Sequence, residues 1–119
     1  MSINAKSIQY LQEMFNKEDI GENTDILQLT ASHFFAIDKS NKNVYRFIFD
    51  DKNIDEDSDT QYMYIVDERS FEYMIFQVSI KERNTSNLGQ SRISFAEKYI
   101  KEFVDTPTKE FIIEELNEQ

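Results

Sequence analysis

The stretches VYRFIF at Val44–Phe49 and TQYMYIV at Thr60–Val66 decide the fold of this chain. Both are rich in aromatic and branched aliphatic residues that alternate in character along the chain, which is typical of β-strands. In the first stretch, Tyr45, Phe47 and Phe49 would share one face of the strand. Polar clusters bound both stretches, so each predicts one strand that ends in a turn.

The same pattern extends over residues 24–80 and predicts about five mainly antiparallel strands. Sequential antiparallel strands need only short connections, and the turn clusters between the runs supply them. Several runs are apolar on both faces, so the sequence predicts either a curved sheet covered by helices on one side or a small barrel. The expected strands are Asp25–Thr30, Ser32–Ile37, Val44–Phe49, Thr60–Val66 and Phe71–Ile80.

Helices are expected on both sides of this β-rich region. Over Ser2–Asp19, apolar residues recur at helical spacing. The polar segment Lys81–Gln90 predicts a loop, and the next helix would be capped by Ser91 or Ser94. Its apolar face would carry Ala96, Tyr99, Ile100 and Phe103.

The last segment has two interpretations. Thr106-Pro107 is typical of a helix start, with threonine as the cap and proline in the first turn. The following Phe111–Ile113 run would also suit a short strand, although its surrounding glutamates favour a helix. The predicted class is therefore α+β, with an N-terminal helix and one or two C-terminal helices.

Length and composition predict one folded domain over residues 1–119. Hydrophobic residues make up 39% of the chain and aromatic residues 13%, enough large side chains to form a core. The start of the chain lacks the apolar core of a signal peptide, and no apolar run approaches the roughly 18 residues of a membrane span. These features predict a cytoplasmic protein without a membrane partner. Frequent Ile, Lys, Asn, Phe and Tyr are typical of AT-rich genomes such as those of low-GC Gram-positive bacteria, their plasmids and phages.

Few residues of the chain are suited to catalysis. There is no cysteine and only one histidine, His33, which lies in an apolar strand and is expected to be structural. Glycine-rich phosphate loops, serine elbows and His-Glu metal motifs are absent from the sequence. An EF-hand frame started at Asp51 or Asp55 lacks the glycine and the final glutamate that calcium needs. We therefore expect no enzymatic activity, no cofactor and no metal.

Charge is distributed unevenly along the chain, whose net charge is −10. Lys81–Lys101 carries five basic residues against Glu82 and Glu97, so its local balance is 5 − 2 = +3. A basic face beside exposed aromatic rings could hold phosphates and stack bases, which makes RNA one candidate partner. The candidate nucleic-acid-binding residues are Lys39, Lys42, Arg46, Lys81, Arg83, Arg92, Lys98 and Lys101.

The acidic residues support a second hypothesis. They concentrate in Asp50–Asp59 and near the C-terminus, and they would suit a protein that docks on a basic partner or mimics nucleic acid. Such an inhibitor would come from a phage or plasmid. The candidate protein-binding residues are Asp55, Glu56, Asp57 and Asp59.

The order of one helix, several strands and a helical end, together with the length and the AT-rich composition, resembles the PrgU family. These are small regulators carried on enterococcal pheromone-responsive conjugative plasmids. The resemblance implies a compact β-barrel similar to the PUA domain, binding of RNA and restraint of the expression of conjugation surface proteins. The resemblance implies that the basic candidates named above would contact the RNA. The net charge of −10 departs from the basic character of most RNA-binding domains.

Overall fold

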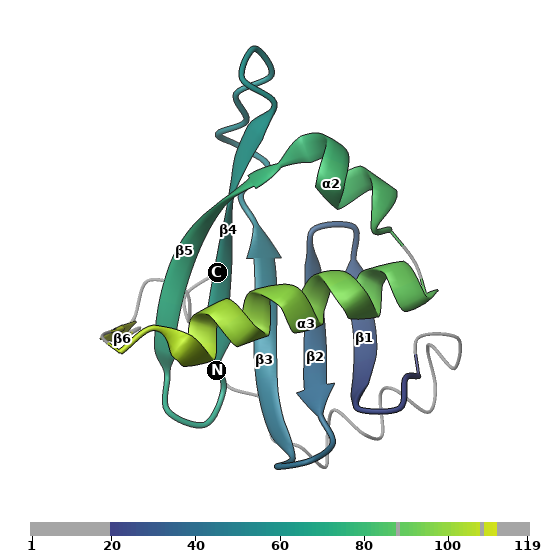
Figure 1. Cartoon of the computed structure of the whole chain (residues 1–119). Coiled ribbons are helices and arrows are strands. Elements are labelled where there is room, and N and C mark those ends of the chain that lie inside the picture. Colours follow the sequence, from purple (N-terminus) through teal and green to yellow (C-terminus); the bar gives the residue numbers. More distant parts are fainter. Residues whose placement is uncertain (1–19, 88, 108, 112–119) are drawn as a thin grey trace.

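The structure is a computed structural model that describes residues 20–87, 89–107 and 109–111. Every strand in it pairs antiparallel with its neighbour in the sequence, in the order β1 to β6 (Figure 1). The class is α+β, as predicted. The strands are β1 Thr24–Thr30, β2 His33–Asp38, β3 Asn43–Phe49, β4 Thr60–Asp67, β5 Glu72–Ser79 and β6 Glu110–Phe111, and the helices are α2 Ile80–Thr85 and α3 Gly89–Asp105.

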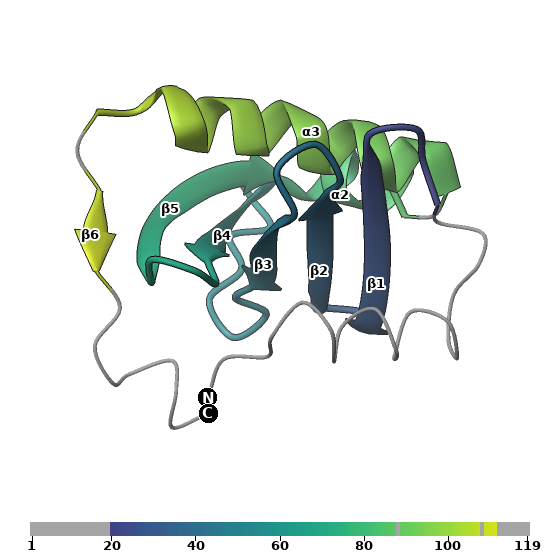
Figure 2. The same ribbon diagram turned by 90° about the horizontal axis from the view of Figure 1, so that it is seen from below.

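The sheet is curved and open. β1 and β6 are its two edges and do not pair with each other, so within the described residues the strands form a sheet rather than a closed barrel. Figure 2 shows β5 bending toward the side on which α3 lies. Strands β1 to β5 agree with the five predicted strands to within one residue at each end.

One face of the sheet forms the main core against α3. The register places Phe34, Phe47 and Ile65 side by side across β2, β3 and β4, and all three are fully buried. Tyr45 and Phe49 belong to the same cluster, which confirms that alternate residues of β3 share this face. The strands therefore position a continuous apolar surface for the helix.

Helix α3 lies on this face and crosses its strands (Figures 1 and 2). Ala96, Tyr99 and Phe103 are buried against the sheet and Ile100 is partly buried, so the predicted apolar face of the helix is confirmed. Arg92 lies on the same side of the helix, one turn earlier, and is also buried.

The opposite face carries a second, smaller cluster. Leu27, Phe35 and Val44 come from β1, β2 and β3 and are all buried, with Ile37 packed beside them. Strands β1 to β3 are therefore apolar on both faces, whereas the same face of β4 and β5 exposes large side chains.

The prediction of a loop over Lys81–Gln90 is wrong in two places. Helix α2 begins directly after β5, where the Ser79 hydroxyl caps it by accepting a hydrogen bond from the Glu82 amide. Helix α3 already begins at Gly89, before the predicted serine caps. Gly89 has a φ of 60°, a left-handed conformation in which glycine carries no steric cost.

The predicted helix start at Thr106-Pro107 is also wrong, because these residues follow the end of α3 and are not helical. Glu110–Phe111 forms the edge strand β6, paired with Glu72 and Tyr73 of β5, so the expected helix does not extend over these two residues. Pairing with β5 satisfies backbone groups, and this overrides the helical preference of the local sequence. The predicted helix over Ser2–Asp19 and the remainder of the C-terminal segment lie outside the described residues.

Candidate binding surfaces

Two of the basic candidates are structural arginines. The Arg92 side chain is 1% exposed, and its guanidinium carbon lies 4.7 Å from the centre of the Phe34 ring. Arg83 lies 4.0 Å above the ring of Phe49 and binds Asp51, with 2.6 Å between Nη1 and Oδ1. Their charges are used inside the fold, where a phosphate could reach them only by displacing these contacts.

Four further basic candidates form ion pairs with acidic neighbours. These pairs are Lys39 with Asp25 at 3.1 Å, Arg46 with Glu68 at 2.6 Å, Lys98 with Glu82 at 3.3 Å and Lys101 with Asp105 at 2.8 Å. Hydrogen bonding to Asp105 also raises the pKa of Lys101. Each carboxylate cancels most of the field that its partner would offer to an anion.

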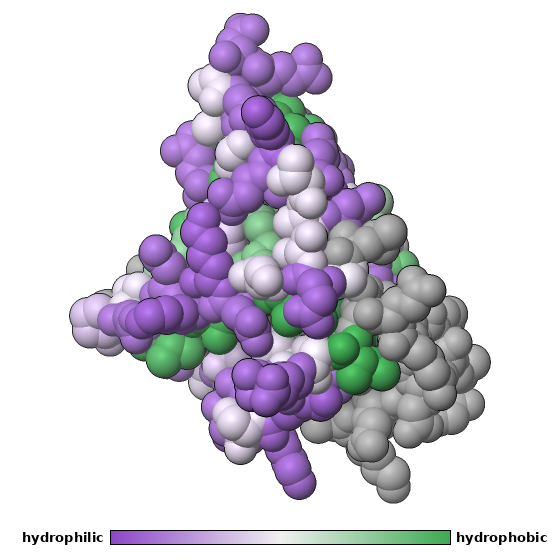
Figure 3. Space-filling view, turned by 45° about the vertical axis from the view of Figure 1, so that its right-hand side comes forward, coloured by the Kyte–Doolittle hydropathy of each residue, from purple (hydrophilic) through white to green (hydrophobic). Residues whose placement is uncertain are grey.

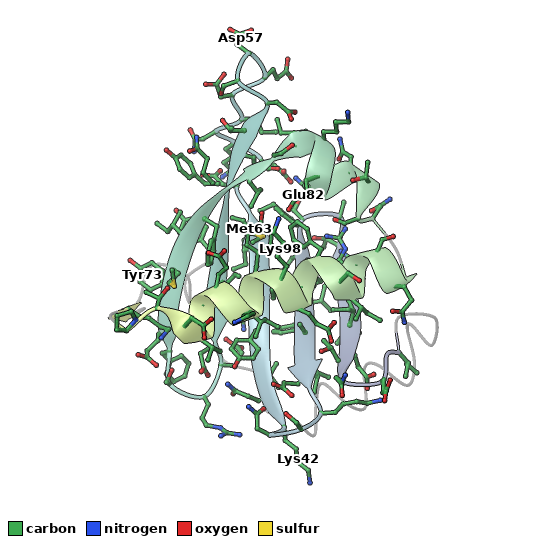
Figure 4. The ribbon with its side chains drawn as sticks, in the orientation of Figure 1. Lys42, Asp57, Met63, Tyr73, Glu82 and Lys98 are labelled. Atoms are coloured by element: carbon green, nitrogen blue, oxygen red, sulfur yellow. The ribbon has the colours of Figure 1, made fainter. Side chains whose placement is uncertain are left out.

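The last two basic candidates, Lys42 and Lys81, are exposed but far apart. In Figure 4, Lys42 lies at the bottom of the molecule in the turn between β2 and β3. Lys81 belongs to α2, which lies near the top (Figure 1). The eight candidates therefore come from both ends of the sheet and from its interior, and the fold does not gather them on one surface.

The acidic candidates lie together on a projection that we call the acidic finger, residues 50–59. It connects β3 to β4 and rises above the rest of the sheet, with Asp57 at its tip (Figures 1 and 4). Every residue from 51 to 59 is exposed. The finger carries six carboxylates against Lys52, a balance of 1 − 6 = −5, and the top of the molecule is almost entirely hydrophilic in Figure 3.

Hydrogen bonds fix the shape of the finger. Asp55 and Thr60 exchange backbone hydrogen bonds of 3.0 Å, which closes the tip as a short hairpin. Hydrogen bonds from Ser58, including one from its backbone N–H to Oδ1 at 3.2 Å, lower the pKa of Asp55. Asp59 adopts a φ of 55°, which turns the chain back into β4. The carboxylates are thus presented on an ordered hairpin.

At its base, the finger is held by Arg83. Nη1 of this arginine donates to Asp51 at 2.6 Å and to Gln61 at 2.8 Å, while Nη2 donates to the Ala31 carbonyl at 2.8 Å. Ser32 also donates to Asp51. One side chain of α2 therefore joins the finger, β4 and the turn between β1 and β2.

Beside the finger, β3 to β5 present what we call the tyrosine face: Ile48, Tyr62, Tyr64, Tyr73 and Ile75. These side chains alternate with the core residues of their strands and point away from α3. Tyr62 is 47% exposed and Ile75 is 48% exposed. The rings of Tyr64 and Tyr73 lie parallel to within 27°, with 6.5 Å between their centres.

A cleft of about 650 Å³ separates the tyrosine face from the finger. Ile48 and Tyr64 line its apolar side and the first turn of the finger lines its polar side. Ile48 and Tyr64 are partly exposed, and accessible apolar side chains next to a charged rim are typical of an interaction site. The polar residues that line the cleft are Asp50, Asp51, Lys52 and Asn53.

His33 lies on the same side of the sheet, near the small apolar cluster. Its ring centre is 5.5 Å from that of Phe35, and its Nε2 atom is shielded from solvent without a hydrogen-bond partner in the described structure. Burial, and secondarily the charge of Arg46, lower the pKa of His33. The imidazole is therefore neutral in the folded protein at neutral pH, in a position that fits the structural role expected for it.

We predict that His33 makes stability depend on pH below about 6.5, the pKa of an unperturbed histidine. The lowered pKa means that the unfolded chain binds a proton at a higher pH than the folded chain does, so acidification favours unfolding. Urea unfolding at a series of pH values should show His33→Gln losing less stability than wild type as the pH falls from 7 to 5. If wild type and His33→Gln lose the same stability between pH 7 and 5, the pH dependence is not due to His33.

Nothing in the described part of the chain resembles a metal centre or a membrane span. No three His, Cys, Asp or Glu side chains there converge on a point that could hold a metal ion. None of the helices within those residues has the length and apolar composition to cross a membrane.

The protein thus has an α+β fold with an open antiparallel sheet, one covering helix and an acidic projection. Comparison with protein-family models, with curated proteins and with solved structures gave no match.

Sequence reasoning included the acidic candidates but missed the tyrosine face. The alternation in TQYMYIV marks Tyr62 and Tyr64 as facing away from Met63 and Ile65, and this could have identified the face.

Proposed function

We propose that this protein is a non-enzymatic binding protein whose acidic finger docks on a positively charged surface of a partner protein. The observation that supports the proposal is the contrast between the two sets of candidates. The carboxylates at Asp55–Asp59 are exposed on an ordered projection, whereas six of the eight basic candidates are paired with carboxylates or stacked on aromatic rings.

The charge of the finger would act mainly on association. A concentrated negative field attracts a basic partner before contact and raises the association rate, and salt weakens this effect. The fixed hairpin would reduce the conformational entropy that is lost when the partner binds. An inhibitor that covers a basic functional surface, or that takes the place of nucleic acid there, fits this description.

The second candidate function is an RNA-binding regulator of conjugative-plasmid gene expression with a PUA-like fold, as the resemblance to the PrgU family implies. One observation favours it: Tyr62, Tyr64 and Tyr73 could stack bases on the open sheet face. The surrounding charges oppose it, because the adjacent finger has a balance of −5 and would repel a phosphate backbone.

Binding to two probes of opposite charge tests the proposal. A fluorescent lysine-rich peptide and a fluorescent single-stranded RNA of the same length are titrated with the protein at low salt. We expect the peptide to bind and the RNA not to bind, and we expect the affinity for the peptide to fall as salt rises. Binding of the RNA together with failure of the peptide would overturn the proposal in favour of the RNA-binding regulator.

The triple variant Asp55→Asn, Glu56→Gln, Asp57→Asn tests the location of the site. It removes three charges from exposed positions while keeping side-chain size, and we expect the association rate for the peptide to fall roughly five- to tenfold. The control is Glu22→Gln, Glu102→Gln, Asp105→Asn, which removes the same charge at exposed positions elsewhere. Equal rates for the two variants would mean that only the net charge matters.

A further inference from the structure

The cleft between the finger and the tyrosine face combines carboxylates with an aromatic ring. Tyr64 lies on one side and Asp50 on the other, and the neighbouring Asp51 also lines the cleft although its carboxylate already binds Arg83. Ile48, Tyr64 and Ile75 form a continuous row across three strands, because the register pairs them directly. This surface offers both an electrostatic and an apolar contact to one side chain of a partner.

Arginine is the side chain that such a surface suits best. Its guanidinium stacks on aromatic rings and donates parallel hydrogen bonds to a carboxylate, whereas the lysine ammonium is a compact and strongly hydrated charge. Lys52 also lines the cleft and Arg83 pairs with Asp51, so positive groups oppose both of its acidic charges. Selection here would therefore depend on stacking and hydrogen-bond geometry more than on charge alone.

The chain itself contains this arrangement on the other side of the same loop. Arg83 stacks 4.0 Å above the ring of Phe49 and binds Asp51 at 2.6 Å. Arg46 likewise lies 5.1 Å from the ring of Phe35 while it pairs with Glu68. Carboxylate and ring together thus hold a guanidinium at two places in this fold.

We infer that the cleft and the tyrosine face bind an extended, arginine-rich segment of a partner protein and select arginine over lysine. The inference rests on the proposed function and adds the chemistry of the partner. From Thr60, where the finger ends, to Tyr64 the strand covers roughly 13 Å at about 3.3 Å per residue. An extended segment lying along β4 would place one arginine in the cleft against Tyr64 and bring another, about four residues further on, to the exposed carboxylates of the finger.

Two synthetic peptides of equal length and charge test the inference, one with arginine and the other with lysine at every basic position. Wild-type protein should bind the arginine peptide roughly five- to tenfold more tightly in fluorescence anisotropy titrations. The double variant Tyr62→Leu, Tyr64→Leu should remove this difference, while Tyr62→Phe, Tyr64→Phe should keep it because the rings remain. Circular dichroism spectra that match wild type would show that each variant folds.

The outcomes separate this inference from the proposed function. If both peptides bind equally to wild type, or if the leucine variant keeps the preference, the arginine site is wrong but the finger proposal stands. If the triple variant Asp55→Asn, Glu56→Gln, Asp57→Asn binds both peptides more weakly by the same factor and still prefers arginine, both ideas are supported. Failure of both peptides to bind would overturn both, and tighter binding of a single-stranded RNA that the leucine variant abolishes would assign the face to nucleic acid.

Discussion

Replacing Phe47 with alanine is expected to lower the free energy of unfolding by about 3–5 kcal/mol. Phe47 is fully buried at the centre of β3, where its ring stacks on Phe34 with 4.5 Å between centres and 15° between planes. The substitution removes that contact and leaves a cavity beneath α3 that neighbours on adjacent strands cannot fill without moving. Urea unfolding followed by circular dichroism measures the loss directly.

A loss of this size is a large part of the total stability of a small domain, typically about 5–15 kcal/mol. Val104→Ala is the matched control, because Val104 is an aliphatic residue on α3 that is 56% exposed. We expect this control to change stability by less than about 0.5 kcal/mol. A loss for Phe47→Ala no larger than that of the control would show that the face between β3 and α3 is not the main core.

The sequence predicted the strands well because their side chains are sorted by a local rule. In a strand, alternate residues face opposite sides, so the core positions of β3 and β4 follow from the pattern alone. The apolar face of α3 was predictable for the same reason, since its residues recur every three or four positions. These elements required no knowledge of distant contacts.

Helix α2 was missed although its start is encoded locally. Ser79 and Glu82 have the spacing of a serine cap with an acidic residue three positions later, but the apolar run before them was assigned to strand through Ile80. The edge strand β6 could not have been predicted in this way. It forms where Glu72 and Tyr73 of β5 supply backbone partners, a contact that joins segments far apart in the sequence.

The basic candidates show a different limit of sequence reasoning. A count of charges places Arg83 and Arg92 in a basic segment, yet the fold stacks both on aromatic rings of the core. For Arg92 a local signal exists, because it precedes Ala96 by four residues and so shares the apolar stripe of α3. For Arg83 no local signal exists, because its partner Asp51 comes from the finger, 32 positions earlier in the chain.

The second large effect is expected at Arg83, whose replacement by methionine should cost about 2–3 kcal/mol of stability. Methionine can still pack on Phe49, but it cannot donate the hydrogen bonds that Arg83 gives to Asp51, Gln61 and the Ala31 carbonyl. The groups left without a donor would have to be resolvated at a site where the Arg83 side chain is only 13% exposed. Urea unfolding of Arg83→Met against wild type measures this cost.

Lys98→Met is the matched control, because it removes one ion pair between α3 and α2 whose two side chains are 57% and 36% exposed. Exposed pairs of this kind contribute about 0–1 kcal/mol, so the control should change little. The loss of stability for Arg83→Lys should fall between the losses for Arg83→Met and for the control. Lysine keeps the positive charge, but its single ammonium cannot donate to both Asp51 and the Ala31 carbonyl as the guanidinium does. Equal losses for Arg83→Met and the control would mean that the hydrogen bonds at the finger base add no stability.

The location of the damage should distinguish a clamp from a general core contact. If Arg83 holds the finger to the turn between β1 and β2, its loss should speed hydrogen exchange at the amides of Phe49, bonded to Ser32, and Thr60, bonded to Asp55. Amides in the centre of β2 and β3 should exchange only through global unfolding. Their free energies of opening should therefore fall by no more than the total loss of stability. Uniform acceleration across all strands would contradict the clamp. Selective acceleration in the finger would show that its rigidity, and with it the fixed presentation of its carboxylates, depends on one arginine of α2.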